Sequence, residues 1–102
     1  MTESHADDVL VPEALRPLIP RFQQRTAAEL ARLQAALAAG DWRSIEQMAH
    51  KLKGSAGSYG FHHLGNLAGR LETAAKAAEP SVATALVAAL HEHFAKASVR
   101  YV

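Results

Sequence analysis

Residues 48–61 read Met-Ala-His-Lys-Leu-Lys-Gly-Ser-Ala-Gly-Ser-Tyr-Gly-Phe, a stretch that carries one histidine, His50. Each residue of an α-helix advances by about 100°, so Lys53, Gly54 and Gly57 would all lie within about 60° of His50. A glycine inside a helix costs about 1 kcal/mol relative to alanine. The two glycines therefore indicate a stripe that stays bare so that another molecule can approach the histidine.

The apolar residues around His50 predict a helix whose core-facing side lies elsewhere. Asp41 is a typical N-cap residue, and the apolar positions that follow it recur at steps of three and four. They are Trp42, Ile45, Ala49, Leu52, Ala56 and Tyr59. His50 is turned about 100° from Ala49 and about 160° from Leu52. We therefore expect His50 to point away from the core.

Three further amphipathic segments surround this helix. The first runs from Pro20 to Gly40, the next from about His62 to Ala78, and the last follows residues 79–81 and stays apolar as far as Tyr101. Short connections favour antiparallel neighbours. The sequence therefore predicts an all-α fold, an antiparallel up-down-up-down four-helix bundle.

The N-terminal part of the chain does not fit the helical pattern. Residues 1–8 are polar without apolar periodicity, and we expect a flexible N-terminus there. Residues 9–19 are apolar but interrupted by Pro12 and Pro17, so at most a short helical segment fits, one that could cap the bundle. Residues 9–102 would then form a single domain.

Composition argues against several classes of function. The chain has no cysteine, which excludes disulfides and thiolate chemistry. Its net charge is +1 with acidic and basic residues interspersed, unlike a nucleic-acid surface. No apolar run approaches the ~20 residues of a membrane span, and the acidic N-terminus is unlike a secretory signal. We expect a cytoplasmic protein that binds neither nucleic acid nor membrane.

Phosphoryl transfer is the chemistry that suits His50 and its neighbours. A neutral imidazole is a competent nucleophile toward an activated phosphoryl group. Such transfer needs mainly positioning and charge stabilisation, which Lys53 could supply from one turn away. The alternative is that His50 and Lys53 are ordinary solvated surface and that Gly54 marks a frayed or closely packed helix.

Nucleotide and metal sites are not predicted. Residues 54–60 are glycine-rich, but they lack the Gly-Lys-Ser/Thr ending of a phosphate loop and no strand precedes them. The other histidines do not complete a metal site, because His62 and His63 are adjacent and His91 and His93 would point about 160° apart on a helix.

The stretch from Ala49 to Phe61, followed by Leu64, Leu67 and Leu71-Glu72, resembles the signature of histidine-containing phosphotransfer (HPt) domains. That signature runs approximately His-x-Leu-Lys-Gly-Ser/Ala-Ala/Ser, three residues, Gly, an apolar residue and then a leucine-spaced helix. The number of helices and the chain length agree with this family as well.

The resemblance implies a role for each matching residue. His50 would be phosphorylated, by family usage at Nε2, with Lys53 as its basic neighbour and Gly54 as the position that permits docking. Glu72 stands where related domains carry Glu or Gln bonded to the other ring nitrogen, which would fix the tautomer. Glu46, one turn before His50, could orient the ring instead or form half of a metal site. The sequence leaves open which carboxylate contacts His50, and Glu72 could also be an ordinary surface residue.

The resemblance predicts a histidine phosphotransfer protein of a two-component phosphorelay. Its partners would be a response-regulator receiver domain, a hybrid histidine kinase, or both. No cofactor is expected, since Mg²⁺ would be held by the receiver, and the protein should be a monomer without its own ATP site. The receiver would dock around His50, and the other residues predicted for that face are Glu46, Gln47, Lys51, Gly54, Gly57, Ser58 and Phe61.

Two other classes of function remain open. One is the histidine-bearing substrate domain of a chemotaxis-type kinase, phosphorylated by an ATP-binding domain. The other is a non-catalytic helical adaptor in which His50 is incidental.

Overall fold

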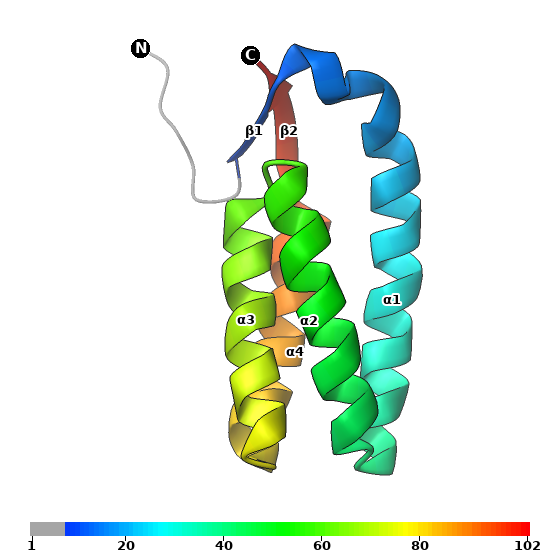
Figure 1. Ribbon diagram of the computed structural model, residues 1–102, viewed down its shortest axis with the longest axis vertical. Helices are drawn as coiled ribbons and strands as arrows, with labels where there is room; N and C mark the ends of the chain where they lie inside the picture. The colour runs from blue at the N-terminus through cyan, green and yellow to red at the C-terminus, as the bar shows by residue number, and fades with distance from the viewer. Residues whose placement is uncertain (1–7) are drawn as a thin grey trace.

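In the computed structural model, which describes residues 8–102, four α-helices lie side by side (Figure 1). Their bounds are α1 (Ile19–Ala39), α2 (Trp42–Ser58), α3 (His62–Lys76) and α4 (Pro80–Lys96). A 3₁₀ helix, η1 (Glu13–Leu18), leads into α1, and two short strands, β1 (Asp8–Val11) and β2 (Ser98–Tyr101), stand at the same end of the molecule. All four predicted helices are present, and so is the short helical segment before them.

The boundaries of α1 and α2 follow from local chemistry. Pro20 lies in the first turn of α1, where its missing N–H costs nothing, and Gly40 ends the helix in the left-handed conformation at φ 67°. The carboxylate of Asp41 then caps α2, because Oδ1 accepts from the Ser44 backbone N–H at 3.2 Å and Oδ2 from the Ser44 hydroxyl at 2.7 Å.

The core lies between the four helices and contains the apolar stripe predicted for α2. Ile45, Ala49, Leu52 and Ala56 are fully buried, whereas Trp42 and Tyr59 at the two ends of the stripe are half-buried. The large buried side chains from the other helices include Phe22, Leu30, Leu33, Leu64, Leu71, Val87 and Leu90.

Helices α2 and α3 approach each other closely because α3 carries Gly65 at their contact. A Cβ atom at Gly65 would lie 3.4 Å from the Lys53 carbonyl oxygen and 3.7 Å from the Ala56 Cβ. A larger side chain there would push the helices apart. This close packing sets the spacing across which side chains of α2 and α3 can meet.

The C-terminal end differs from the prediction. The last helix was predicted to continue to Tyr101, but α4 ends at Lys96 and the chain becomes strand β2. This strand pairs in parallel with β1, in the register Asp8↔Ser98, Val9↔Val99, Leu10↔Arg100 and Val11↔Tyr101. Pairing lets Val9 and Val11 be buried, and this burial over the end of the bundle favours strand over helix. The fold is therefore mainly α-helical, with a two-stranded sheet in place of purely helical ends.

The predicted flexible terminus, residues 1–8, lies almost wholly outside the described residues. Asp8 belongs to β1, and its carboxylate lies 3.7 Å from the guanidinium of Arg100 on β2. Within residues 8–102, no helix combines the length and the apolar character needed to cross a membrane.

Candidate functional site

His50 projects outward from α2. Its side chain is 69% exposed, while Ala49 and Leu52 beside it on the helix are fully buried. The orientation away from the core is the one that the three- and four-residue spacing predicts. The imidazole is therefore accessible to a second molecule.

The carboxylate of Glu72, on α3, contacts the imidazole of His50. Its Oε2 lies 3.0 Å from Nδ1 of His50, and its side chain is only 12% exposed. Because an ionised carboxylate accepts hydrogen bonds and cannot donate them, Nδ1 carries the proton in this contact and Nε2 of the neutral ring has a free lone pair. Of the two candidate carboxylates, Glu72 is the one that contacts the histidine, and Glu46 lies nearby in the same surface hollow.

Three cationic or potentially cationic side chains surround the Glu72 carboxylate. Besides His50, Lys53 Nζ lies 3.7 Å from Oε1 and Lys76 Nζ lies 3.7 Å from Oε2. Burial tends to raise the pKa of Glu72, but the hydrogen bond from His50 and the charges of His50, Lys76 and Lys53 outweigh it, so the pKa lies below its usual value. The carboxylate is therefore ionised at neutral pH and can fix the ring.

Lys76 was not singled out from the sequence. It lies four residues after Glu72 on α3, the spacing at which a lysine meets a preceding glutamate on a helix. That spacing was the signal available in the sequence. It indicates a residue of the site only because the structure places Glu72 against His50.

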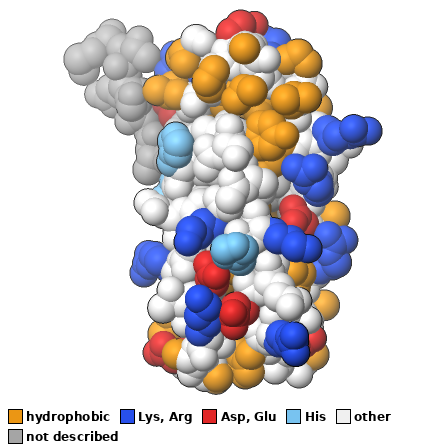
Figure 2. Space-filling model, in the orientation of Figure 1, with side chains coloured by type: hydrophobic (Ala, Val, Ile, Leu, Met, Phe, Trp, Pro, Cys, Tyr) orange, Lys and Arg blue, Asp and Glu red, His pale blue; other side chains and the backbone are white. Residues whose placement is uncertain are grey.

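The glycine stripe beside His50 is open. Gly54 and Gly57 are exposed, and a Cβ atom added to either would meet nothing within 4 Å. Neither glycine is therefore required by packing within the molecule. Figure 2 shows this face, with acidic and basic side chains gathered over α2 and α3 and hydrophobic side chains gathered toward the end that carries η1.

Most of the predicted docking residues border the histidine. Glu46, Gln47 and Lys51 line a hollow together with His50 and Glu72. Ser58 is exposed at the end of α2, where its hydroxyl donates to the Gly54 carbonyl at 3.0 Å. These residues present a largely polar surface around the imidazole.

Phe61 is the exception, and its prediction as a docking residue was wrong. Its side chain is 1% exposed and packs against Phe22, with 4.9 Å between the ring centroids. The chain turns inward after Gly60, and burying an aromatic ring there is more favourable than leaving it in water.

The described residues contain no group of three or more His, Cys, Asp or Glu side chains that could hold a metal ion. His63 and His93 do meet, edge to face, with 4.5 Å between their ring centroids. The site at His50 itself consists of one accessible imidazole, the Glu72 carboxylate, and the ammonium groups of Lys53 and Lys76.

One family of known proteins matches the chain. The family is described as Hpt domain, and its match covers residues 17–98, which include all four α-helices. No curated protein and no solved structure matches the chain.

Proposed function

Because the chain belongs to the Hpt domain family, which serves histidine phosphotransfer in two-component signalling, we propose that it carries a phosphoryl group on Nε2 of His50. The donor and acceptor would be the aspartate of a response-regulator receiver domain, alone or within a hybrid histidine kinase. The observation that carries this proposal is the Nδ1 contact with Glu72, since it leaves Nε2 of an exposed ring as the nucleophile.

The transfer can be written for these atoms. The lone pair of Nε2 attacks the phosphorus of the aspartyl phosphate, the bond from phosphorus to the carboxyl oxygen breaks, and the aspartate leaves as a carboxylate. The phosphorylated ring keeps its proton on Nδ1 and gains positive charge, which the ionised Glu72 stabilises. The reverse reaction returns the phosphoryl group to a receiver.

Lys53 would offset the charge of the phosphoryl group. It stands one turn from His50 on α2 with its side chain 55% exposed, so its ammonium can turn from Glu72 toward a group on Nε2. The bare stripe at Gly54 and Gly57 would let the receiver bring its acidic, Mg²⁺-binding pocket up to the ring.

The remaining parts of the proposal concern the location of the protein, its oligomeric state, its cofactors and the arrangement of its helices. We propose a cytoplasmic monomer without a cofactor of its own, and an antiparallel up-down-up-down arrangement of its helices. Connections of only two or three residues between consecutive helices support that arrangement.

Transfer of labelled phosphoryl groups tests the function. The wild-type protein should take up acid-labile, base-stable label from at least one phosphorylated receiver of a panel, and His50→Gln should take up none. His63→Gln, which removes another exposed histidine, should label like wild type. Equal labelling of His50→Gln would refute the assignment. Labelling by an ATP-dependent kinase but by no receiver would favour a kinase substrate domain, and no labelling from any source would favour an adaptor.

A further inference from the structure

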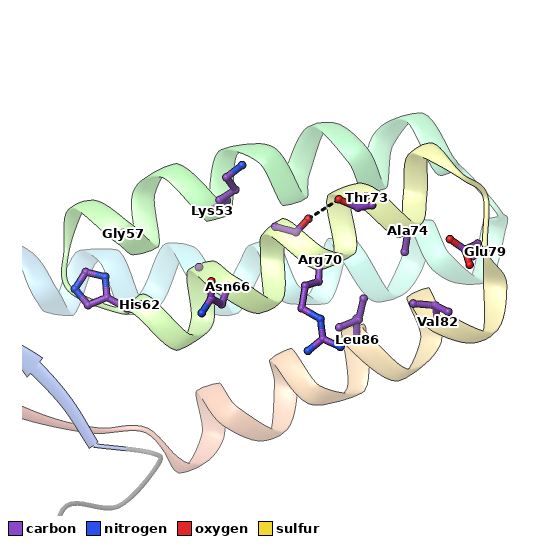
Figure 3. Close-up of a pocket in the computed structure, with 12 residues that line it drawn as sticks. Lys53, Gly57, His62, Asn66, Arg70, Thr73, Ala74, Glu79, Val82 and Leu86 are labelled. Carbon is purple, nitrogen blue, oxygen red and sulfur yellow. Dashed lines mark hydrogen bonds between the residues drawn. The ribbon is translucent and has the colours of Figure 1, made fainter.

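A groove of about 660 Å³ crosses the outer face of α3, on the side away from the core (Figure 3). It is lined by α2 at Lys53, by α3 at Asn66 and Arg70, and by α4 at Val82 and Leu86. Figure 3 shows Arg70 extending from α3 toward α4, where Val82 and Leu86 point back toward α3. None of these five residues apart from Lys53 was assigned a function above.

The polar side chains in the groove are available to a partner. Arg70 and Asn66 are exposed and make no hydrogen bond or ion pair with any residue in the described part of the chain. An arginine presents a planar fork of donors that fits a carboxylate in bidentate fashion. Lys53 adds positive charge at the α2 wall, and Glu79 supplies the one acidic side chain among the lining residues, beside α4. An acidic side chain is therefore the group that Arg70 would recognise.

The α4 wall of the groove is apolar. Val82 is 44% exposed, and Leu86 lies beneath it at 5% exposure. A single exposed valine is common on protein surfaces. This one adjoins an unpaired arginine in a concave surface, so a partner that places an acidic group on Arg70 can cover Val82 with an apolar side chain at the same time.

The groove is continuous with the site at His50. Lys53 lines the groove and also pairs with Glu72, the residue that holds the imidazole. Lys53 therefore joins the groove to the surface around His50, and a domain seated over His50 can reach the groove at this residue.

We infer that this groove is a second recognition surface for the receiver partner, one that takes an acidic side chain on Arg70 and an apolar side chain on Val82. The inference rests on the proposed function and names the features by which a suitable receiver is selected. His50 and Glu72 would carry out the transfer, whereas Arg70 and Val82 would determine which receivers bind.

Transfer kinetics with charge-changing variants test the inference. A receiver that exchanges phosphoryl groups with the wild type is first chosen from a panel. With that receiver, Arg70→Glu and Val82→Asp should each raise the KM about tenfold and leave kcat within about twofold, because they act on docking and not on chemistry. Arg70→Gln should have a smaller effect in the same direction. Phosphorylation of His50 by phosphoramidate, a donor too small to reach the groove while it reacts at the ring, should not change.

Matched controls keep the result specific. Arg25→Glu makes the same charge reversal at an exposed position of α1, and Ala88→Asp introduces the same carboxylate at an exposed position of α4 outside the groove. Both should transfer like wild type. The inference is overturned if Arg70→Glu, Arg70→Gln and Val82→Asp change the KM no more than these controls. It is also overturned if they slow the reaction with phosphoramidate. Failure of the wild type to accept phosphoryl groups from phosphoramidate and from every receiver would instead refute the proposed function.

Discussion

Nδ1 of His50 lies 3.0 Å from Oε2 of Glu72, a residue 22 positions later in the chain and on the neighbouring helix. This contact links α2 to α3 and fixes which ring nitrogen carries the proton. It also places a negative charge that is only partly exposed beside an exposed imidazole. The chemistry of the site therefore depends on how closely two helices pack.

Removal of the Glu72 carboxylate should impair phosphorylation without abolishing it. We expect Glu72→Ala to slow the reaction of His50 with phosphoramidate by about fivefold to tenfold, because the acceptor at Nδ1 is gone. Glu72→Gln keeps an acceptor oxygen and should fall between alanine and wild type. Nitrogen-15 NMR of the ring should show the Nδ1–H tautomer dominating in wild type and not in Glu72→Ala. An unchanged tautomer ratio in Glu72→Ala would contradict this account.

The stability of the protein should depend on pH through Glu72. The pKa of this carboxyl lies below its usual value because the favourable contacts with His50, Lys76 and Lys53 outweigh the effect of burial. A lowered folded-state pKa stabilises the protein above the unfolded-state pKa of about 4.3, and that stabilisation is lost as the pH falls through the folded value. Urea unfolding should therefore find wild type more stable than Glu72→Gln at pH 6, and by a smaller margin at pH 3. A difference of the same size at both pH values would argue against the assignment.

Substitutions at Gly54 should affect the stability of the protein and its phosphoryl transfer in different ways. Nothing lies within 4 Å of a Cβ atom at this position, so Gly54→Ala should raise the free energy of unfolding by up to about 1 kcal/mol. Gly54→Arg should also fold, but its side chain would obstruct the approach to His50 and reduce transfer to a receiver strongly. Ala31→Arg, at an exposed position of α1, serves as the control for adding an arginine. Normal transfer by Gly54→Arg would show that the bare stripe is not needed.

Gly60 should be among the least replaceable glycines. It has a φ of 87°, and a Cβ atom there would lie 2.9 Å from the Leu10 carbonyl oxygen of β1. Gly60→Ala should therefore lower the free energy of unfolding by about 2–3 kcal/mol. Gly40 has a φ of 67° with nothing within 4 Å of a Cβ atom, so Gly40→Ala isolates the backbone cost, about 1 kcal/mol. The two variants are compared by urea unfolding. Equal losses in the free energy of unfolding would mean that steric contact with β1 adds nothing to the cost of a side chain at Gly60.

Local patterns in the sequence predicted the helices and the direction of His50. The apolar stripe of α2 and the boundary at Gly40 and Asp41 depend only on residues within a few positions of one another. Strand β2 was missed because Ala97 and Tyr101 continue the four-residue spacing of α4, so the pattern looks helical. Only pairing with β1, about 90 residues earlier, makes the strand favourable.

The parts of the site that join two helices could not be read from spacing. Glu46 satisfied the local rule for contact with His50, whereas Glu72 reaches it through the packing of α3 on α2. Phe61 lies between helices, where periodicity assigns no direction, and its burial follows from its contact with Phe22. The groove at Arg70 likewise requires α2, α3 and α4 to be placed together.

Thr26 on α1 should be a site at which the protein can be stabilised. Its side chain is fully buried, and its hydroxyl oxygen has no hydrogen-bond partner within residues 8–102. Thr26→Val keeps the shape of the side chain and removes an unpaired polar group, so the free energy of unfolding should rise by about 1 kcal/mol. Thr84→Val is the control, because the Thr84 hydroxyl donates to the Pro80 carbonyl at 2.7 Å and its loss should bring no gain. Urea unfolding of both variants decides the matter, and a less stable Thr26→Val would show that the buried hydroxyl is satisfied in solution.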